Sequence, residues 1–155
     1  LLRYVFENCS DFEEAIVVLS QEPLARSALF TITGVHSDQI AVVERTETKA
    51  RVIRGPVAVA NDWQKPEQGW KARMGHDNNV ARREAMLETK NNDVPFNWAQ
   101  PPVVNKLTRL VVEMSAINDG VLHARGYESG SMFKMAIPAT LDFSLRHTKQ
   151  EPLAA

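Results

Sequence analysis

The sequence predicts an α+β domain with a largely antiparallel sheet, on the basis of three observations. In the first 22 residues, apolar side chains recur every three or four positions, which is typical of amphipathic helices. From residue 28 onward, short apolar runs rich in β-branched residues alternate with polar turns, as in consecutive strands. A length of 155 residues suffices for one sizeable core, since about 150 residues bury roughly 70% of their unfolded surface. We therefore expect one domain over residues 1–145 and a frayed tail over residues 146–155.

Two helices are expected at the start of the chain. Leu1–Glu7 has apolar side chains at helical spacing. A second helix is expected to begin at Ser10, because Glu13, three residues later, completes a capping box, and to stop before Pro23. Cys9 precedes this helix, a position that can lower a thiol pKa, but with no histidine nearby we interpret it as a packing residue.

Four strands are expected to follow, and the short turns between them indicate an antiparallel meander. The stretch Gly55–Pro66 contains the fourth strand, which runs into Asn61, Asp62 and Trp63. The amide of Asn61 could be presented there to a substrate, or Asn61 or Asp62 could simply close an Asx turn. The expected strands are Ala28–Thr33, Gln39–Arg45, Lys49–Arg54 and Val57–Ala60.

A third helix and further strands are expected in the second half of the chain. The sequence Asn118-Asp119-Gly120 is a strong hairpin signal, so the strands on either side of it should pair. The expected elements are a loop over Pro66–Asn79, a helix over Val80–Thr89, and strands over Asn105–Met114, Val121–Tyr127 and Met132–Ile137.

Composition argues against several classes of function. The net charge is −1, and the densest basic pair, Arg82-Arg83, is too small to follow a phosphate backbone, so no nucleic-acid partner is expected. No apolar run approaches the roughly 20 residues of a membrane helix. The four histidines share no metal-ligand spacing, and we expect neither a metal nor another cofactor. The compartment is left open, although a single cysteine is compatible with the cytoplasm.

Four short motifs follow one another between Leu1 and Tyr127. Their order resembles the later part of the acid ceramidase and N-acylethanolamine acid amidase family, in which a helix, a strand ending in Asn, a pair of arginines and a further strand follow in turn. The matching positions are Phe12, Ala15, Leu19, Pro23 and Leu24; Asn61, Trp63 and Lys65; Arg82 and Arg83; and Pro102, Val103, Asn105, Lys106, Leu107 and Thr108.

The resemblance implies part of an N-terminal-nucleophile (Ntn) hydrolase: a four-layer αββα sandwich that cleaves itself to expose a catalytic cysteine and then hydrolyses the amide bond of an N-acyl substrate. Asn61 would donate a hydrogen bond to the oxyanion. Arg82 would orient the substrate or the loop around the site, or else it is a surface cation of a helix. The spacing from Asn61 to Trp63 is shorter than is usual in the family.

The resemblance also implies that the nucleophile lies upstream of Leu1, because Cys9 matches no catalytic position of the family. The remaining N-terminal part of the same enzyme would then be a partner, and the chain alone would be inactive. Two alternatives stay open: acyl transfer to an amine on the same scaffold, and a non-catalytic sheet module that binds a partner. As an isolated piece, the chain should expose an apolar sheet face that favours a homo-oligomer or a second chain.

Overall fold

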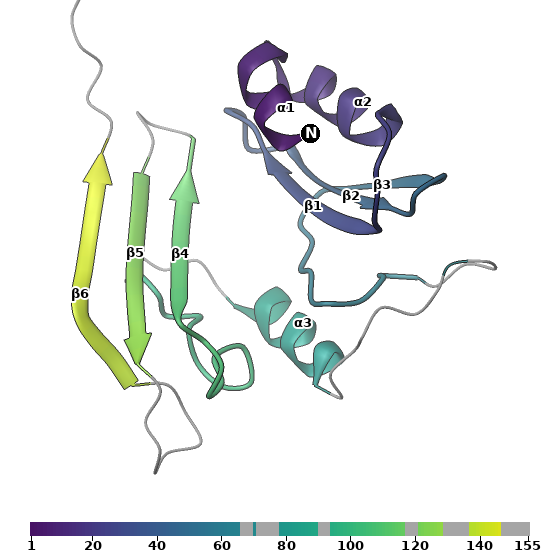
Figure 1. Cartoon of the computed structure of the whole chain (residues 1–155). Coiled ribbons are helices and arrows are strands. Elements are labelled where there is room, and N and C mark those ends of the chain that lie inside the picture. The colour runs from purple at the N-terminus through teal and green to yellow at the C-terminus, as the bar shows by residue number, and fades with distance from the viewer. Residues whose placement is uncertain (66–69, 71–77, 90–93, 117–120, 129–136, 147–155) are drawn as a thin grey trace, which may run out of the picture. The chain divides into compact units, whose positions relative to one another are not determined.

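The computed structural model describes residues 1–65, 70, 78–89, 94–116, 121–128 and 137–146, which form helices and antiparallel sheets (Figure 1). The expected α+β class is thereby confirmed. The chain divides into two compact units, Leu1–Glu88 and Thr89–Ala155. A single domain over residues 1–145 stays a prediction. Among the described residues, no helix has the length and apolar character needed to cross a membrane.

The first unit is built on a three-stranded antiparallel sheet in the order β1-β2-β3. Its strands are β1 (Ala28–Thr33), β2 (Ile40–Arg45) and β3 (Ala50–Arg54), which confirms three of the expected strands to within one residue. The central strand β2 is buried from Ala41 to Arg45, so its alternate side chains contribute to both faces of the sheet.

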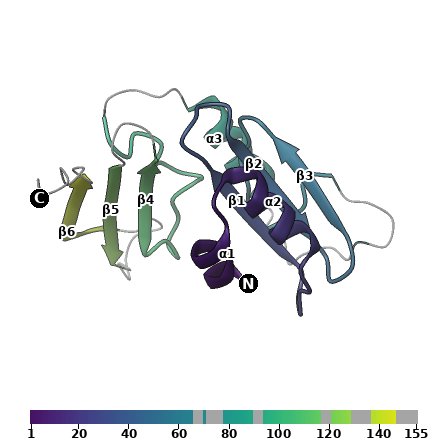
Figure 2. The same cartoon turned by 90° about the horizontal axis from the view of Figure 1, so that it is seen from above.

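Helices α1 (Leu2–Asn8) and α2 (Phe12–Gln21) lie on one face of this sheet (Figure 1), and α2 extends over the strands when seen from above (Figure 2). Both expected helices are therefore present. The core between α2 and the sheet forms because residues at helical spacing on α2 meet alternate residues of β2. The buried members of this core are Phe12, Ile16, Leu19, Ala41 and Val43.

The cap of α2 lies one residue later than expected. Asp11 is the N-cap, and its carboxylate accepts a hydrogen bond from the Glu14 backbone N–H at 2.8 Å. The Glu14 carboxylate in turn accepts from the backbone N–H of Ser10 at 2.7 Å. Ser10 was expected to be the cap, with Glu13 as its partner. That prediction is wrong by one residue: an aspartate caps a helix as well as a serine does, so Asp11 is the cap and Glu14 is its partner.

Glu13 instead forms an exposed ion pair with Arg54 of β3, with N–O distances of 2.7 and 2.6 Å. The hydrogen bond from Arg54 lowers the pKa of Glu13. Because the folded-state pKa is depressed, the pair stabilises the fold above the unfolded-state pKa and loses this effect as the pH falls through the folded-state pKa.

We expect an NMR titration of the Glu13 side chain to give a pKa below the ordinary glutamate value, and Arg54→Gln to return it toward that value. The loss of stability in Glu13→Gln should be present at pH 7 and should fade in acid. A Glu13 pKa that does not respond to Arg54→Gln would contradict the pairing.

The segment Val57–Ala60 was expected to be a fourth strand, and this is wrong. Gly55 adopts φ +90°, a conformation that is easy for glycine, and donates a last ladder-like hydrogen bond to Ile40 O at 2.9 Å. Pro56 follows and has no N–H to extend the ladder. The chain therefore leaves the sheet on the side away from α1 and α2 (Figure 1). The unit ends with α3 (Asn79–Glu88), which agrees with the expected helix to within one residue.

The second unit has its own antiparallel sheet, in the order β4-β5-β6. β4 and β5 pair with Ser115 opposite Val121, as the hairpin signal predicted, although residues 117–120 lie outside the described part. Most of the loop 66–79, the segment 132–136 and the tail 147–155 also lie outside it. The strands are β4 (Leu110–Ser115), β5 (Val121–Glu128) and β6 (Ile137–Arg146), so β6 begins at the residue where the last expected strand should have ended.

β4 begins five residues later than expected, because the residues before it form a turn. The Asn105 side chain accepts from the Leu107 backbone N–H at 2.9 Å, and the Thr108 hydroxyl accepts from the Asn105 backbone N–H at 3.0 Å. Asn and Thr side chains satisfy the backbone locally in this way and so compete with a strand. The pattern Pro102–Thr108 therefore lies before β4 and not within it.

One face of this second sheet is covered by the segment that precedes it. Glu113 of β4 fixes that segment, because its carboxylate accepts from the Phe96 backbone N–H at 2.7 Å and also from the indole N–H of Trp98. On the opposite face of β4, Leu110 and Met114 are 61% and 75% exposed. The covered core consists of Phe96, Val104, Val111 and Tyr127.

Candidate functional site

Asn61 lies at an exposed bend directly after the buried Ala60. Within the described part of the chain, its side chain makes no hydrogen bond, so its amide N–H groups remain available as donors. The local turn bond is made by the neighbouring residue, since Asp62 Oδ1 accepts from the Trp63 backbone N–H at 2.8 Å. This bond joins adjacent residues, and the N–H of Gln64, which an Asx turn at Asp62 would use, is bound by Glu44, so neither Asn61 nor Asp62 closes an Asx turn.

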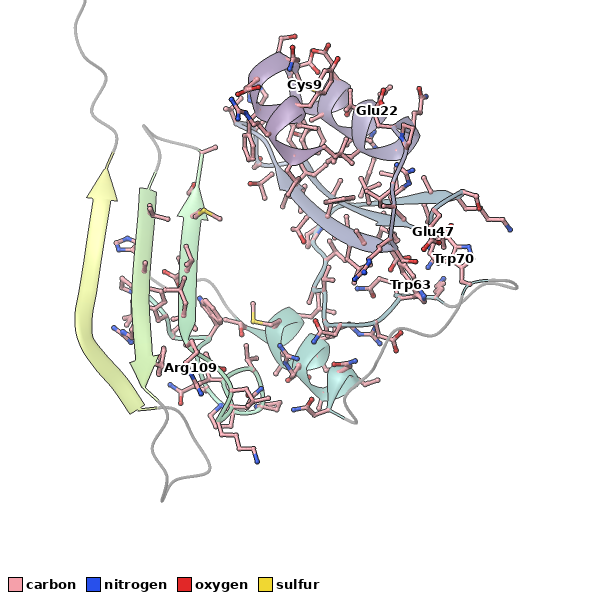
Figure 3. The ribbon with its side chains drawn as sticks, in the orientation of Figure 1. Cys9, Glu22, Glu47, Trp63, Trp70 and Arg109 are labelled. Atoms are coloured by element: carbon pink, nitrogen blue, oxygen red, sulfur yellow. The ribbon has the colours of Figure 1, made fainter. Side chains whose placement is uncertain are left out.

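Trp63 anchors the chain immediately after the bend. It is 2% exposed and packs edge to face with Trp70, with 4.6 Å between the ring centroids and 73° between the ring planes (Figure 3). Aromatic pairs in this geometry add to the stabilisation that burial provides. The Trp63 carbonyl also accepts a hydrogen bond from Arg83 of α3 at 3.1 Å. The bend is thus tied to the body of the unit two residues after Asn61.

Glu44 connects this segment to the central strand of the sheet. The carboxylate is completely buried, and its Oε1 accepts from the Gln64 backbone N–H at 2.6 Å. Its Oε2 accepts from Arg51, the residue directly opposite on β3, with the Arg51 Nε at 2.7 Å. A buried carboxylate is costly unless it is paired and hydrogen-bonded, and here both oxygens have donors.

Arg51 extends the connection one residue further along the chain. Besides Glu44, its guanidinium donates to the Lys65 carbonyl and lies over the Trp70 ring, 4.9 Å from the centroid. A cation in this position is attracted to the ring face. Arg51 therefore contacts Glu44 of the sheet, the Lys65 carbonyl and the Trp70 ring.

The loop that carries Asn61 is also closed at its base by a bond of its own. The side-chain N–H of Gln64 donates to the Ala58 carbonyl, which joins the residue three positions before Asn61 to the residue three positions after it. We call residues 58–64 the Asn61 loop. Its base is fixed by this bond and by Glu44, while its apex presents an unpaired amide.

The two arginines of α3 differ in their contacts. Arg82, the expected site arginine, is partly buried, and its Nε has no hydrogen-bond partner within the described residues. No hydrogen bond joins it to Asn61 in that part of the chain. The second arginine, Arg83, is the one that reaches the Asn61 loop, at the Trp63 carbonyl.

No role in the site was assigned to Glu44, Arg51 or Arg83 from the sequence. A signal for the first was present, because Glu44 follows the apolar run Ile40–Val43 on a strand expected to be central, where a charge needs a partner. That Glu44 binds the backbone of residue 64 depends on the path of the loop, which no local sequence pattern specifies.

Cys9 lies between α1 and α2, away from this site (Figure 3). Partial burial raises the pKa of its thiol, and the carboxylates of Glu14 and Asp11 raise the pKa further. Its surroundings therefore oppose the thiolate, which is the reactive form, and agree with the interpretation of Cys9 as a packing residue.

We expect Cys9 to react with iodoacetamide at pH 7.5 more slowly than a free cysteine in an unstructured peptide. Glu14→Gln should speed the reaction by removing one carboxylate. The pH dependence of the alkylation rate, followed by mass spectrometry, measures both effects. Reaction at the peptide's rate would contradict a raised pKa.

Comparison of the chain with protein-family models, curated proteins and solved structures gives no match. No three His, Cys, Asp or Glu side chains gather as a metal site within the described ranges.

Proposed function

We propose that this chain is the C-terminal part of a cysteine Ntn hydrolase that cleaves a linear amide bond in an N-acyl substrate. The observation that supports it best is the Asn61 loop, whose base is fixed by Glu44 and Gln64 while the Asn61 amide remains unpaired and exposed. A donor that is held in place before charge develops stabilises an oxyanion by roughly 3 kcal/mol, because it needs no reorganisation during the reaction.

In this proposal the nucleophile is an N-terminal cysteine of the upstream part of the enzyme. Its α-amine takes the thiol proton, and the sulfur attacks the amide carbonyl carbon. Asn61 donates an N–H to the oxyanion of the tetrahedral intermediate. Collapse breaks the C–N bond, the amine departs with a proton, and water then hydrolyses the acyl-thioester.

The arginines of α3 receive separate roles. Arg82 would orient the substrate, while Arg83 holds the Asn61 loop through the Trp63 carbonyl. The antiparallel sheets would belong to a four-layer αββα sandwich that the upstream part of the enzyme completes.

The proposal is tested on the full-length precursor by intact-mass analysis and by an assay with N-acyl amides. We expect cleavage directly before a cysteine, followed by release of the free acid. Adding an amine acceptor separates hydrolysis from acyl transfer, since acyl transfer would yield a new amide. A precursor that neither cleaves itself nor releases acid or new amide would overturn the proposal.

A binding module is a second candidate, and the exposed Leu110 and Met114 on one face of β4 favour it. Exposed apolar side chains on a strand at the edge of a sheet suit contact with another chain or a second copy. N-terminal sequencing of the native protein distinguishes the two candidates, because the enzyme requires an upstream segment that begins with cysteine.

A further inference from the structure

We infer that Glu44 is a positioning residue for Asn61, holding the loop that presents the amide. This inference rests on the proposed function, because only an oxyanion donor has to be held at a fixed position. Glu44 itself lies on the sheet and does not contact the substrate in this scheme.

The two carboxylate oxygens of Glu44 accept hydrogen bonds from two different parts of the unit, the Asn61 loop and strand β3. Oε1 accepts from the backbone of the Asn61 loop at Gln64, 2.6 Å away, and Oε2 accepts from Arg51 of β3. Because Gln64 also donates to the Ala58 carbonyl, the bond to Oε1 fixes both ends of the loop at once. The carboxylate thus holds the base of the loop at a fixed position relative to the sheet.

The strand that carries Glu44 is a firm support for this purpose. β2 is paired on both sides, with Leu29 of β1 and Arg51 of β3 opposite Glu44. The carboxylate is 0% exposed, so solvent does not compete for its hydrogen bonds. Arg51 holds the chain beyond the loop as well, through the Lys65 carbonyl.

Stability alone does not account for a charge at this position. Replacing a buried ion pair with apolar side chains of similar volume is often neutral or stabilising, and Val42, two residues earlier on the same face, is apolar and fully buried. What an apolar residue at position 44 could not do is accept the Gln64 N–H. The geometry therefore points to placement of the loop as the role of Glu44.

The test is a double-mutant cycle on the full-length enzyme, with kcat and KM measured for Glu44→Gln, Asn61→Ala and the double variant. We expect Glu44→Gln to lower kcat about tenfold with KM changed less than about twofold. An amide has one acceptor oxygen for the two donors, so when Arg51 takes it the Gln64 N–H loses its acceptor and the Asn61 amide is no longer held where the oxyanion forms. In the Asn61→Ala background, Glu44→Gln should lower kcat by less than about twofold, since no donor is left to position.

Gln64→Met supplies a second variant, which keeps the buried charge and the bond from Glu44 to the residue-64 backbone but removes the bond to Ala58. It breaks the link through which Glu44 is inferred to hold both ends of the loop, so it gives a readout even if Glu44→Gln does not fold. We expect the same selective loss of kcat, and the same coupling to Asn61→Ala. Glu13→Gln is the matched control, because it also removes a carboxylate paired with a β3 arginine but lies on the opposite face. It should leave kcat unchanged.

Effects of Glu44→Gln or Gln64→Met that multiply with that of Asn61→Ala would overturn the inference and assign these residues to general support of the fold. Unchanged kcat in both single variants would overturn it as well. A separate result, unchanged kcat in Asn61→Ala itself, would refute the proposed function.

Discussion

Glu44→Ala is expected to lower the free energy of unfolding of the full-length protein by about 3–5 kcal/mol, the range measured when one partner of a buried ion pair is removed. The change takes away the carboxylate opposite Arg51, whose side chain is only 19% exposed. It also leaves the Gln64 backbone N–H without its acceptor. Urea unfolding at pH 7 measures this loss of stability. The m-value, which is the slope of the unfolding free energy against urea concentration, should stay constant if the denatured state is unaffected.

The control for this prediction is Glu44→Met combined with Arg51→Met, which should recover part of the lost stability, because no charge remains buried while the Gln64 N–H still lacks its acceptor. Glu13→Ala should cost much less, since its pair with Arg54 is exposed. A loss below about 1 kcal/mol in Glu44→Ala, as is typical of surface pairs, would contradict the burial of this contact.

Asn61→Ala is expected to lower kcat of the full-length enzyme about 10²–10³-fold with little change in KM, as when one oxyanion donor is removed. The effect falls on kcat because charge develops on the oxygen only in the transition state. Asn61 makes no hydrogen bond among the described residues, so its removal should cost little folding stability. Steady-state kinetics together with thermal unfolding separate the two effects.

Asp62→Asn is the matched control for Asn61, since it retains an oxygen that can accept from the Trp63 N–H. It should leave kcat within about twofold of the unaltered enzyme, which corresponds to less than about 0.5 kcal/mol. Equal losses of kcat in the two variants would assign the effect to the shape of the bend and not to the Asn61 amide.

The elements that the sequence predicted well are those set by local patterns. Strands β1, β2 and β3 were predicted to within one residue because short apolar runs rich in β-branched residues, bounded by polar turns, determine them. The same reasoning failed at Val57–Ala60, which is apolar enough for a strand. There, Gly55 and Pro56 end the ladder, so Ala58 and Ala60 are buried without strand pairing, and the two valines between and before them are partly buried.

The position of Asn61 at an exposed bend could be predicted, but the contacts that fix its loop could not. The Glu44–Arg51 pair depends on the register of two strands, and its bond to Gln64 depends on where the chain returns after leaving the sheet. The choice between Arg82 and Arg83 depends on how α3 is turned about its axis relative to the loop. These contacts are set by the tertiary structure, and local sequence patterns do not predict them.

If Asn61 serves a cysteine from outside this chain, the acyl-enzyme on that cysteine can be trapped. The matured full-length protein is mixed with an N-acyl substrate, quenched in acid within a turnover, and analysed by intact mass and peptide mapping. We predict an acyl adduct on a cysteine at the new N-terminus, and a smaller adduct fraction in Asn61→Ala because formation of the acyl-enzyme is slowed. A matured protein without an N-terminal cysteine, or an adduct found only on Cys9, would rule out this role for Asn61.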